Sequence, residues 1–285
     1  MPVFDAFFTT PEGQSFGFGY AAGVLWSCDP LGDLPVELET SQGYQQTGAT
    51  VEGRSISGVT RTITGRILRN AAYLRLQLRD LFAPGVTGRL TVAGKFWCDA
   101  EVQRCPAVSA AQLWPTFSFQ LYCPSPFWRS VGETTVTTLQ VTPAFRLPTR
   151  YTTHQYGIRE QADYLRVHNP GLDTQEFTLT LTAHGTVTNP GVLDPETGEY
   201  LRFVCTLQDT DQLRVYREAG RLVIQQIISG QAVNGFGLLD EQSTLWTLPH
   251  GTHPWQRTAD AGAEKLYLTL SFCPAFATLV MEDTR

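Results

Sequence analysis

The second half of the chain consists of short alternating segments separated by turn residues, and this pattern restricts the fold more than any other feature. In EFTLTLTAHG (176–185) and EKLYLTLSF (264–272), apolar and polar side chains alternate with the period of a half-buried strand. Asn-Pro-Gly, Glu-Thr-Gly and Pro-His-Gly turns separate segments of this kind. Six or more short strands at this spacing predict an antiparallel β-sandwich or jelly roll.

The first half has the same β character with one interruption. The segment VTRTITGRI (59–67) is rich in β-branched residues and predicts a strand. The next segment, RNAAYLRLQLRDLFAPG (69–85), changes to a helical period. Asn70 is a candidate cap at its start, and Pro84-Gly85 predicts its end. We therefore expect a mainly β N-terminal domain, of sandwich or split-barrel-like form, with a single helix.

The predicted helix has one apolar face and several arginines outside it. The apolar side chains that fall on one face are Ala71, Leu74, Leu78 and Leu81. Three arginines lie off this stripe and are candidate interface residues: Arg69, Arg75 and Arg79. Lys95 and Lys265 are the only lysines, so the chain strongly prefers arginine to lysine. Arginine suits planar, bidentate contacts at interfaces, but high genomic GC content produces the same preference.

The segment TFSFQLYCPSPFW (116–128) contains a strand that stops abruptly. Apolar and polar residues alternate strictly up to position 122, which predicts a half-buried strand. Pro124 and Pro126 cannot donate to a sheet ladder, so the strand must end there. Phe127 and Trp128 follow directly and are candidate packing or interface residues. We expect a structural stop and a packing anchor at this point.

Residues 131–160 have a different composition, rich in threonine and broken by Pro143 and Pro148. We place the boundary between two domains here, with an N-terminal domain at 1–130 and a C-terminal domain at 131–285. Residues 131–160 are then a linker region at the start of the second domain.

Composition argues against several classes of function. The net charge of -6 and pI near 5.4 do not fit general nucleic-acid binding, which requires a basic surface. The N-terminal segment does not resemble a signal peptide, and no apolar run is long enough for a transmembrane helix, so we expect no membrane insertion. The six cysteines are expected to be reduced and mostly buried.

Motifs for catalysis, metals and cofactors are weak or absent. The cysteines form no Cys-x-x-Cys pair, and there is neither a phosphate-binding loop nor a dinucleotide fingerprint. Asp194 and Glu241 lie in acidic turns without the facing geometry that a glycosidase needs. Ser243, His250 and Asp240 can be drawn as a triad, but no nucleophile elbow accompanies them. We therefore predict no catalytic residues, no metal, no cofactor and no enzyme activity.

Aromatic residues near turns of the second half leave two interpretations open. Trp246, His253 and Trp255 are candidate carbohydrate contacts, because aromatic rings can stack on sugars. The same residues also suit a protein interface, and any single one of them can equally be part of the core.

Several motifs together resemble the siphophage distal tail proteins. The order of TRTITGRI, the helical segment, GRLTV and FSFQLYCPSPFW is similar to the N-terminal domain of that family. LRVHNPG, EFTLTLTAHG and TNPGVLDPETGEYLRF are similar to its C-terminal β-sandwich. The LWTLPHGTHPW segment departs from the family pattern, with His253 where asparagine is usual. The resemblance extends from about residue 55 to 280.

This resemblance implies a structural hub in a virion tail. The chain is expected to form a homo-hexameric ring at the distal end of a long tail, assembled in the host cytoplasm. Its partners are expected to be the tail tube protein and the tail tip or hub protein, with the tape measure protein as a further partner and DNA only in transit through the lumen. The C-terminal sandwich is implied to be galectin-like and to lie outside the ring. The alternative function is a carbohydrate-binding module that contacts the host cell surface.

Overall fold

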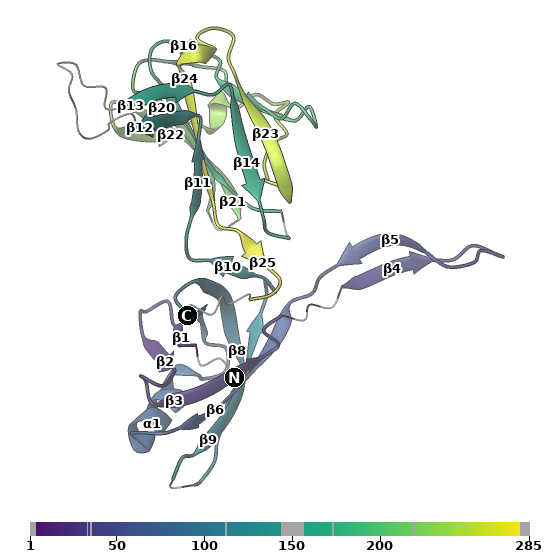
Figure 1. Ribbon diagram of the computed structural model, residues 1–285, viewed down its shortest axis with the longest axis vertical. Helices are drawn as coiled ribbons and strands as arrows, with labels where there is room; N and C mark the ends of the chain where they lie inside the picture. The colour runs from purple at the N-terminus through teal and green to yellow at the C-terminus, as the bar shows by residue number, and fades with distance from the viewer. Residues whose placement is uncertain are drawn as a thin grey trace. The chain divides into compact units, whose positions relative to one another are not determined.

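The chain crosses twice between two β-rich units in the computed structural model (Figure 1). Unit 1 consists of two parts of the chain, the part that ends at Gly132 and the part that begins at Ala275. Unit 2 is Glu133–Pro274. The structure describes residues 4–279 other than 33, 35, 112, 144–156, 173 and 219. No helix in these described ranges has the length and apolar character needed to cross a membrane.

Unit 1 is built on a nine-stranded antiparallel sheet. Seven strands follow the order β2-β1-β7-β8-β9-β6-β3, while β10 pairs with β8 and with β25. The two ends of this path meet only at an isolated bridge between Gly19 and Val24, and the sheet does not close into a barrel. The strands are β1 Ala6–Thr9, β2 Ser15–Phe18, β3 Val24–Asp29, β6 Val59–Ile67, β7 Thr87–Val92, β8 Phe96–Val108, β9 Thr116–Cys123, β10 Trp128–Ser130 and β25 Ala275–Phe276.

The helix α1, Ala71–Leu81, covers one side of the core of unit 1. Leu74, Leu78 and Leu81 are its buried residues, which confirms the predicted apolar face. The predicted cap is wrong in its chemistry: the Asn70 side chain makes no capping hydrogen bond, and its backbone takes a left-handed conformation instead. Asparagine adopts that conformation more readily than most residues, so Asn70 serves as a bend between β6 and α1.

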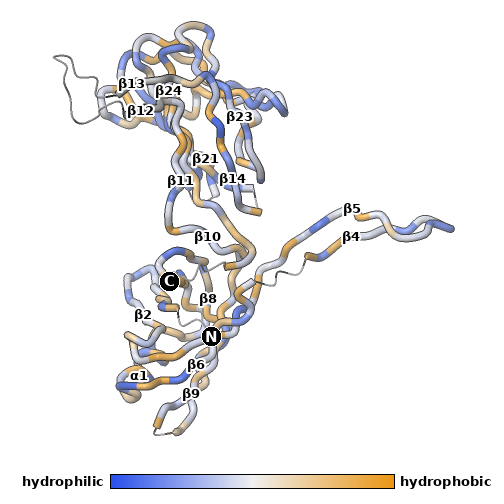
Figure 2. Tube along the Cα trace, in the orientation of Figure 1, coloured by the Kyte–Doolittle hydropathy of each residue, from blue (hydrophilic) through white to orange (hydrophobic). Residues whose placement is uncertain are grey.

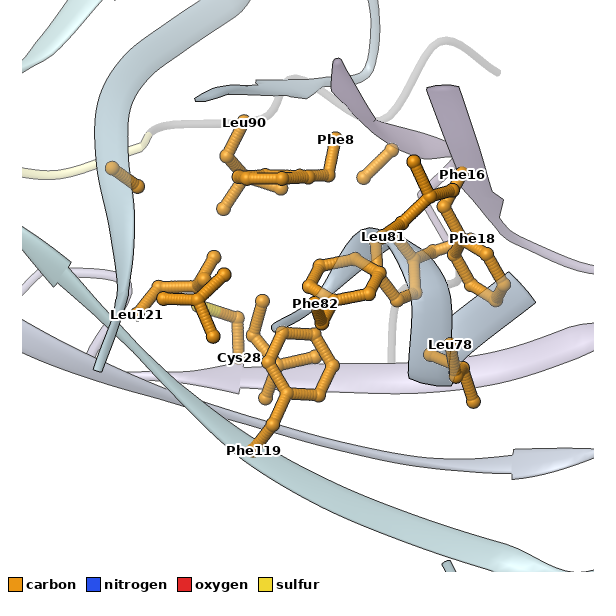
Figure 3. Close-up of a cluster of buried hydrophobic side chains, with 14 of the residues drawn as sticks. Phe8, Phe16, Phe18, Cys28, Leu78, Leu81, Phe82, Leu90, Phe119 and Leu121 are labelled. Carbon is orange, nitrogen blue, oxygen red and sulfur yellow. The ribbon is translucent and has the colours of Figure 1, made fainter. Parts of the chain in front are cut away.

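Aromatic rings fill the centre of unit 1 (Figure 3). Phe82, just past the end of α1, lies between Phe8 of β1 and Phe119 of β9, with ring centroids 4.9 and 4.5 Å away. Tilted ring pairs at such separations add favourable contacts to the area they bury. The core therefore joins the helix to both halves of the sheet.

Local sequence signals explain the strands on either side of this core. Strand β6 covers the segment predicted for it. The turn between β7 and β8 uses Ala93 and Gly94 with positive φ, as tight hairpins require. Strand β9 alternates buried and exposed residues and stops immediately before Pro124, again as predicted.

A separate two-stranded hairpin interrupts unit 1 between β3 and β6. Its strands are β4 Glu37–Ser41 and β5 Thr50–Ser55, which pair antiparallel with each other and with no other strand of the described chain. Figure 1 shows it as a ribbon of its own outside the nine-stranded sheet.

Unit 2 is an antiparallel sandwich. Its larger sheet has six strands in the order β11-β24-β15-β20-β21-β22, and its smaller sheet has four in the order β14-β23-β17-β18. The strands of these two sheets are β11 Thr134–Thr137, β14 Tyr164–Asn169, β15 Thr178–Ala183, β17 Gly191–Leu193, β18 Tyr200–Arg202, β20 Gln212–Glu218, β21 Arg221–Ile228, β22 Gln231–Asn234, β23 Gly251–Thr258 and β24 Leu266–Phe272. Short pairs and turns complete it: β12 Leu139–Pro143 with β13 Gly157–Gln161, β16 Val187–Thr188 with β19 Thr206–Leu207, and the 3-10 turns η1 Phe236–Leu238 and η2 Ala263–Lys265.

Both sheets contribute side chains to the core of unit 2. Leu179 and Leu181 come from the larger sheet, and Val192 and Trp255 come from the smaller one. This alternation of inward apolar and outward polar residues is what the sequence pattern predicted. The predicted fold class is confirmed: the chain is mainly β, with two β domains and one α-helix in its described part.

The predicted domain limits need two corrections. The chain end from Ala275 belongs to unit 1, not to the second domain, because β25 pairs with β10 and the Phe276 ring meets Phe96 edge to face at 6.0 Å. The expected linker at 131–160 also contains strands β11, β12 and β13, so its described part is folded. Residues 144–156 of that region lie outside the described residues.

Candidate assembly surfaces

The β4–β5 hairpin presents apolar side chains to solvent. Every residue of both strands except Gly53 is exposed. Leu38 of β4 is 53% exposed and Val51 of β5 is 44% exposed, and Val36 and Ile56 continue the apolar character at the hairpin base. Figure 2 shows hydrophobic and hydrophilic positions mixed along these strands.

Such an element is unusual in a chain that works alone. A lone two-stranded hairpin gains little stability in water, and exposed strands with apolar side chains readily pair with another chain. Three glutamates, Glu37, Glu39 and Glu52, add negative charge beside the apolar residues. The sequence did contain a signal for this element, because VELET and ATVEG are short β-like runs on either side of a Gly-containing turn region. Our prediction did not include it.

The three arginines predicted as interface residues make separate local contacts. The Arg69 guanidinium lies 5.2 Å from the centre of the Tyr20 ring. Arg75 donates to the carbonyls of Ser109 and Ala111, at 2.9 and 2.6 Å, and so ties α1 to the loop between β8 and β9. Their interface role stays a prediction, and Arg75 already has a structural one.

Arg79, like Arg69 and unlike Arg75, is exposed to solvent. It forms a 2.7 Å ion pair with Asp80, in which both side chains are largely exposed. Exposed apolar groups lie on the same helix and on the neighbouring loop, namely Tyr73, Leu76 and Trp114. This side of unit 1 therefore offers a second candidate surface of aromatic, aliphatic and arginine side chains.

Trp128 is an interior anchor of unit 1. Its ring is fully buried, and its indole N–H donates to the carbonyl of Leu31 at 2.8 Å. The Arg61 guanidinium lies 4.3 Å from the ring centre and also donates to the carbonyl of Pro126 at 2.8 Å. Phe127 is buried beside it. Both aromatics thus pack inside the unit, immediately after the prolines that end β9.

The proposed sugar platform of unit 2 is wrong for its central residue. Trp255 is fully buried and packs edge to face on Phe177 with ring centroids 5.0 Å apart. Trp246 is half-buried against the same core. His253 points inward, with its Nδ1 3.6 Å from a carboxylate oxygen of the buried Asp194. His253 and Trp255, both at odd-numbered positions of β23, therefore face the core of the sandwich and not a stacking surface, whereas the carbohydrate role of the half-buried Trp246 stays a prediction.

The triad drawn from the sequence does not form. Ser243 Oγ accepts from the backbone N–H of Arg202 at 3.1 Å, and the His250 Nδ1–H donates to the carbonyl of Gly171 at 2.7 Å. The Asp240 carboxylate accepts from the backbone of Gln242. Each side chain therefore bonds a different backbone group. Among the described residues, no three His, Cys, Asp or Glu side chains gather as a metal site.

Two open grooves lie on the nine-stranded sheet of unit 1. One has a volume of about 610 Å³ and includes Thr10, Arg89 and Asp99, and the other has about 660 Å³ and includes Ser27 and Thr64. In the first groove, Asp99 is already paired with Arg89 at 3.1 Å. In the second groove, Ser27 and Thr64 hydrogen-bond each other at 2.7 Å. Neither groove brings together an acid, a base and a nucleophile.

Comparison with known proteins decides the fold family. The sequence matches no family model, and no curated protein matches it. In three dimensions it is similar to the Dit protein of phage SPP1, described as a hub of the adsorption apparatus in phages that infect Gram-positive bacteria. The TM-score is 0.66 at 15% identity, and the match covers 96% of this chain and 99% of that chain. The chain has a Dit-like fold.

The Dit-like fold confirms the resemblance to distal tail proteins at the level of structure. Two chains of the phage P2 baseplate, solved in an activated conformation with calcium and with strontium, match more weakly. The calcium structure has a TM-score of 0.48 at 11% identity, and its match covers 98% of this chain and 100% of that chain. The strontium structure has a TM-score of 0.47 at 12% identity, and its match covers 97% of this chain and 99% of that chain.

Proposed function

We propose that this chain is a structural subunit of a phage tail or baseplate, and that its copies form a ring at the distal end of the tail. The similar SPP1 protein is described as part of a hub, and its match extends over nearly the whole of both chains. The ring is proposed to have six copies and to join the tail tube protein to the tip or hub proteins. The tape measure protein is a further proposed partner, and DNA passes only in transit.

The observation that carries the proposal is the β4–β5 hairpin. It exposes Leu38, Val51 and neighbouring apolar residues that contact no core of their own chain. A hairpin on one subunit that fits a different surface of the next makes a head-to-tail interface, and such interfaces close into rings when the rotation allows it. The Dit-like fold and the unpartnered hairpin thus support the same role.

This role requires no catalytic group, and we propose that the chain is not an enzyme. Ser243 and His250 are engaged in turns of unit 2, and the described residues form no metal cluster. The burial of Trp255 also argues against the carbohydrate-binding alternative, because it removes one of the three residues on which that alternative depends.

The test is assembly of the purified chain, followed by light scattering and negative-stain images. We expect rings with an axial hole in the wild type. In the double variant Leu38→Ser with Val51→Ser we expect loss of rings at the same concentration. Burying two such side chains is worth about 3 kcal/mol or more. Each interface should therefore weaken by about a hundredfold or more.

The matched control carries the same chemical change on unit 2. Val204 and Val233 are 57% and 47% exposed, so Val204→Ser with Val233→Ser removes comparable exposed apolar surface. We expect this control to form rings like the wild type. A wild type that stays monomeric at high concentration refutes self-assembly, and rings that survive the hairpin substitutions refute the role given to the hairpin.

A further inference from the structure

A buried cation lies among thiols in the core of unit 1. Arg61, on β6, is fully buried, and in the described part of the chain no carboxylate lies within ion-pair distance of it. Its guanidinium donates to the carbonyls of Pro30 and Pro126 and faces the Trp128 ring, while its Nε has no hydrogen-bond partner. A charge in such a place is costly unless an anion compensates it.

Three buried cysteines lie close enough to this cation for its charge to act on their thiols. Cys28 is on β3, Cys98 on β8 and Cys123 at the end of β9. The Sγ atoms of Cys98 and Cys123 are 3.8 Å apart, a contact between two neighbouring strands. None of the six cysteines of the chain is in a disulfide.

The three thiols differ in their acidity for physical reasons. The hydrogen bond from Cys98 and the positive charge of Arg61 lower the pKa of Cys123, although burial opposes them. The same hydrogen bond and burial raise the pKa of Cys98, which therefore keeps its proton. Burial raises the pKa of Cys28 to about 12. Cys123 is thus the more acidic thiol of the pair, and the charge of Arg61 favours its thiolate form.

We propose that Cys98 and Cys123 are a redox pair that closes into a disulfide between β8 and β9 when the protein meets a peroxide. The sulfurs must approach from 3.8 Å to about 2.05 Å, which requires rotation of the side chains and a small movement of the strands. The site would be a modification site in the interior of unit 1.

The chemistry balances in two steps. The Cys123 thiolate attacks one oxygen of hydrogen peroxide, the O–O bond breaks, hydroxide leaves, and Cys123 becomes a sulfenic acid. The Cys98 sulfur then attacks the sulfenic sulfur, the S–S bond forms and the S–O bond breaks. The Cys98 proton leaves with the oxygen as water, and the hydroxide takes up the proton that Cys123 had lost. Two thiols are oxidised and one peroxide is reduced to two waters.

The cross-link would stabilise unit 1 outside a reducing compartment. It joins two central strands of the nine-stranded sheet and closes the chain segment between them. A closed loop restricts the unfolded chain, so the oxidised protein should unfold at higher urea concentration than the reduced one. A protein that folds with free thiols and later works in an oxidising medium can form such a disulfide cross-link after folding.

The test uses the full chain with Cys105→Ser, because Cys105 is the exposed thiol and would react first. The protein is treated with hydrogen peroxide, denatured in an alkylating agent and cut with trypsin. Cleavage after Lys95, Arg104 and Arg129 places Cys98 in peptide 96–104 and Cys123 in peptide 105–129. We expect these two peptides to be joined, with a loss of two hydrogen atoms from the intact mass.

Variants separate the roles of the three thiols. Cys98→Ser should abolish the cross-link and leave Cys123 with added oxygen, whereas Cys28→Ser should leave the cross-link unchanged. A cross-link that contains Cys28, or full alkylation of Cys98 and Cys123 after a peroxide dose that oxidises Cys105 of the wild type, overturns the proposal. The peptide map of the Cys105→Ser protein decides the question even if another variant fails to fold.

Discussion

Removal of the Trp128 ring tests the packing argument most directly. The side chain is fully buried, and its indole N–H donates to the carbonyl of Leu31 at 2.8 Å. Arg61 faces the ring at 4.3 Å. The variant Trp128→Ala therefore leaves a cavity, an unpaired carbonyl and a buried cation that has lost one of its favourable contacts.

The size of the effect follows from these contacts. Replacing a buried aromatic by alanine costs about 3–5 kcal/mol in the free energy of unfolding. A buried cation–π contact is worth about 2 kcal/mol, and an unsatisfied buried acceptor costs about 1–3 kcal/mol. The cost of replacing the aromatic by alanine already includes part of the cation–π and hydrogen-bond losses, so we expect a total loss of about 4–6 kcal/mol in the free energy of unfolding. Since whole domains are stable by about 5–15 kcal/mol, unit 1 should be close to unfolded.

Urea unfolding followed by circular dichroism measures this loss, with separate transitions fitted for the two units. Trp114→Ala is the matched control, because Trp114 is 59% exposed and its loss should cost less than about 1 kcal/mol. Trp128→Phe keeps most of the ring volume and isolates the lost N–H donor, so an intermediate loss is expected. If Trp128→Ala costs no more than Trp114→Ala, the anchor role of the segment after the prolines is refuted.

Three further outcomes are expected. Truncation after Pro274 removes β25 and should destabilise unit 1 by about 2 kcal/mol or more while leaving the unfolding of unit 2 unchanged, as measured in urea. Gly65→Ala should cost about 1–3 kcal/mol, because the new methyl meets a backbone carbonyl and a phenylalanine ring, whereas Gly237→Ala has open space and should be nearly neutral in the same assay. A hydrogen bond from Asn189 lowers the pKa of Asp260 in the folded protein. The small contribution of the Asp260 carboxylate to stability is therefore present above the unfolded pKa of about 3.9 and is lost as pH falls through the folded pKa. The stability difference between wild type and Asp260→Asn should shrink in acid, and a difference independent of pH contradicts this account.

Elements that depend on neighbouring residues could be predicted from the sequence. Strand β9 alternates because every second side chain enters the core, and Pro124 ends it because proline lacks a donor. The apolar face of α1 is a consequence of its own period. These signals lie within a few residues of each other, so no knowledge of the rest of the chain is needed.

The candidate sites were less predictable because burial depends on distant contacts. Trp128 and Trp255 have similar surroundings in the sequence, each near a proline and an arginine or glutamine, yet the sequence predicts a packing anchor for Trp128 and a candidate carbohydrate contact for Trp255. The structure buries both of them. Leu38 and Val51 are among the apolar residues that the structure exposes instead, in a hairpin whose short strands give only a weak signal in the sequence.

The sequence by itself determined that this chain is mainly β, where its helix lies and where several strands stop, since period and turn chemistry are local properties. Only the tertiary structure decided that the end of the chain returns to unit 1, where Phe276 pairs with Trp128, and that the buried Arg61 lies close enough to three thiols for its charge to act on them. Strand pairing and burial bring together residues far apart in the chain. The local sequence pattern of a segment does not show which distant segment it will contact, because the free energy of such a contact arises only when the two segments pack together.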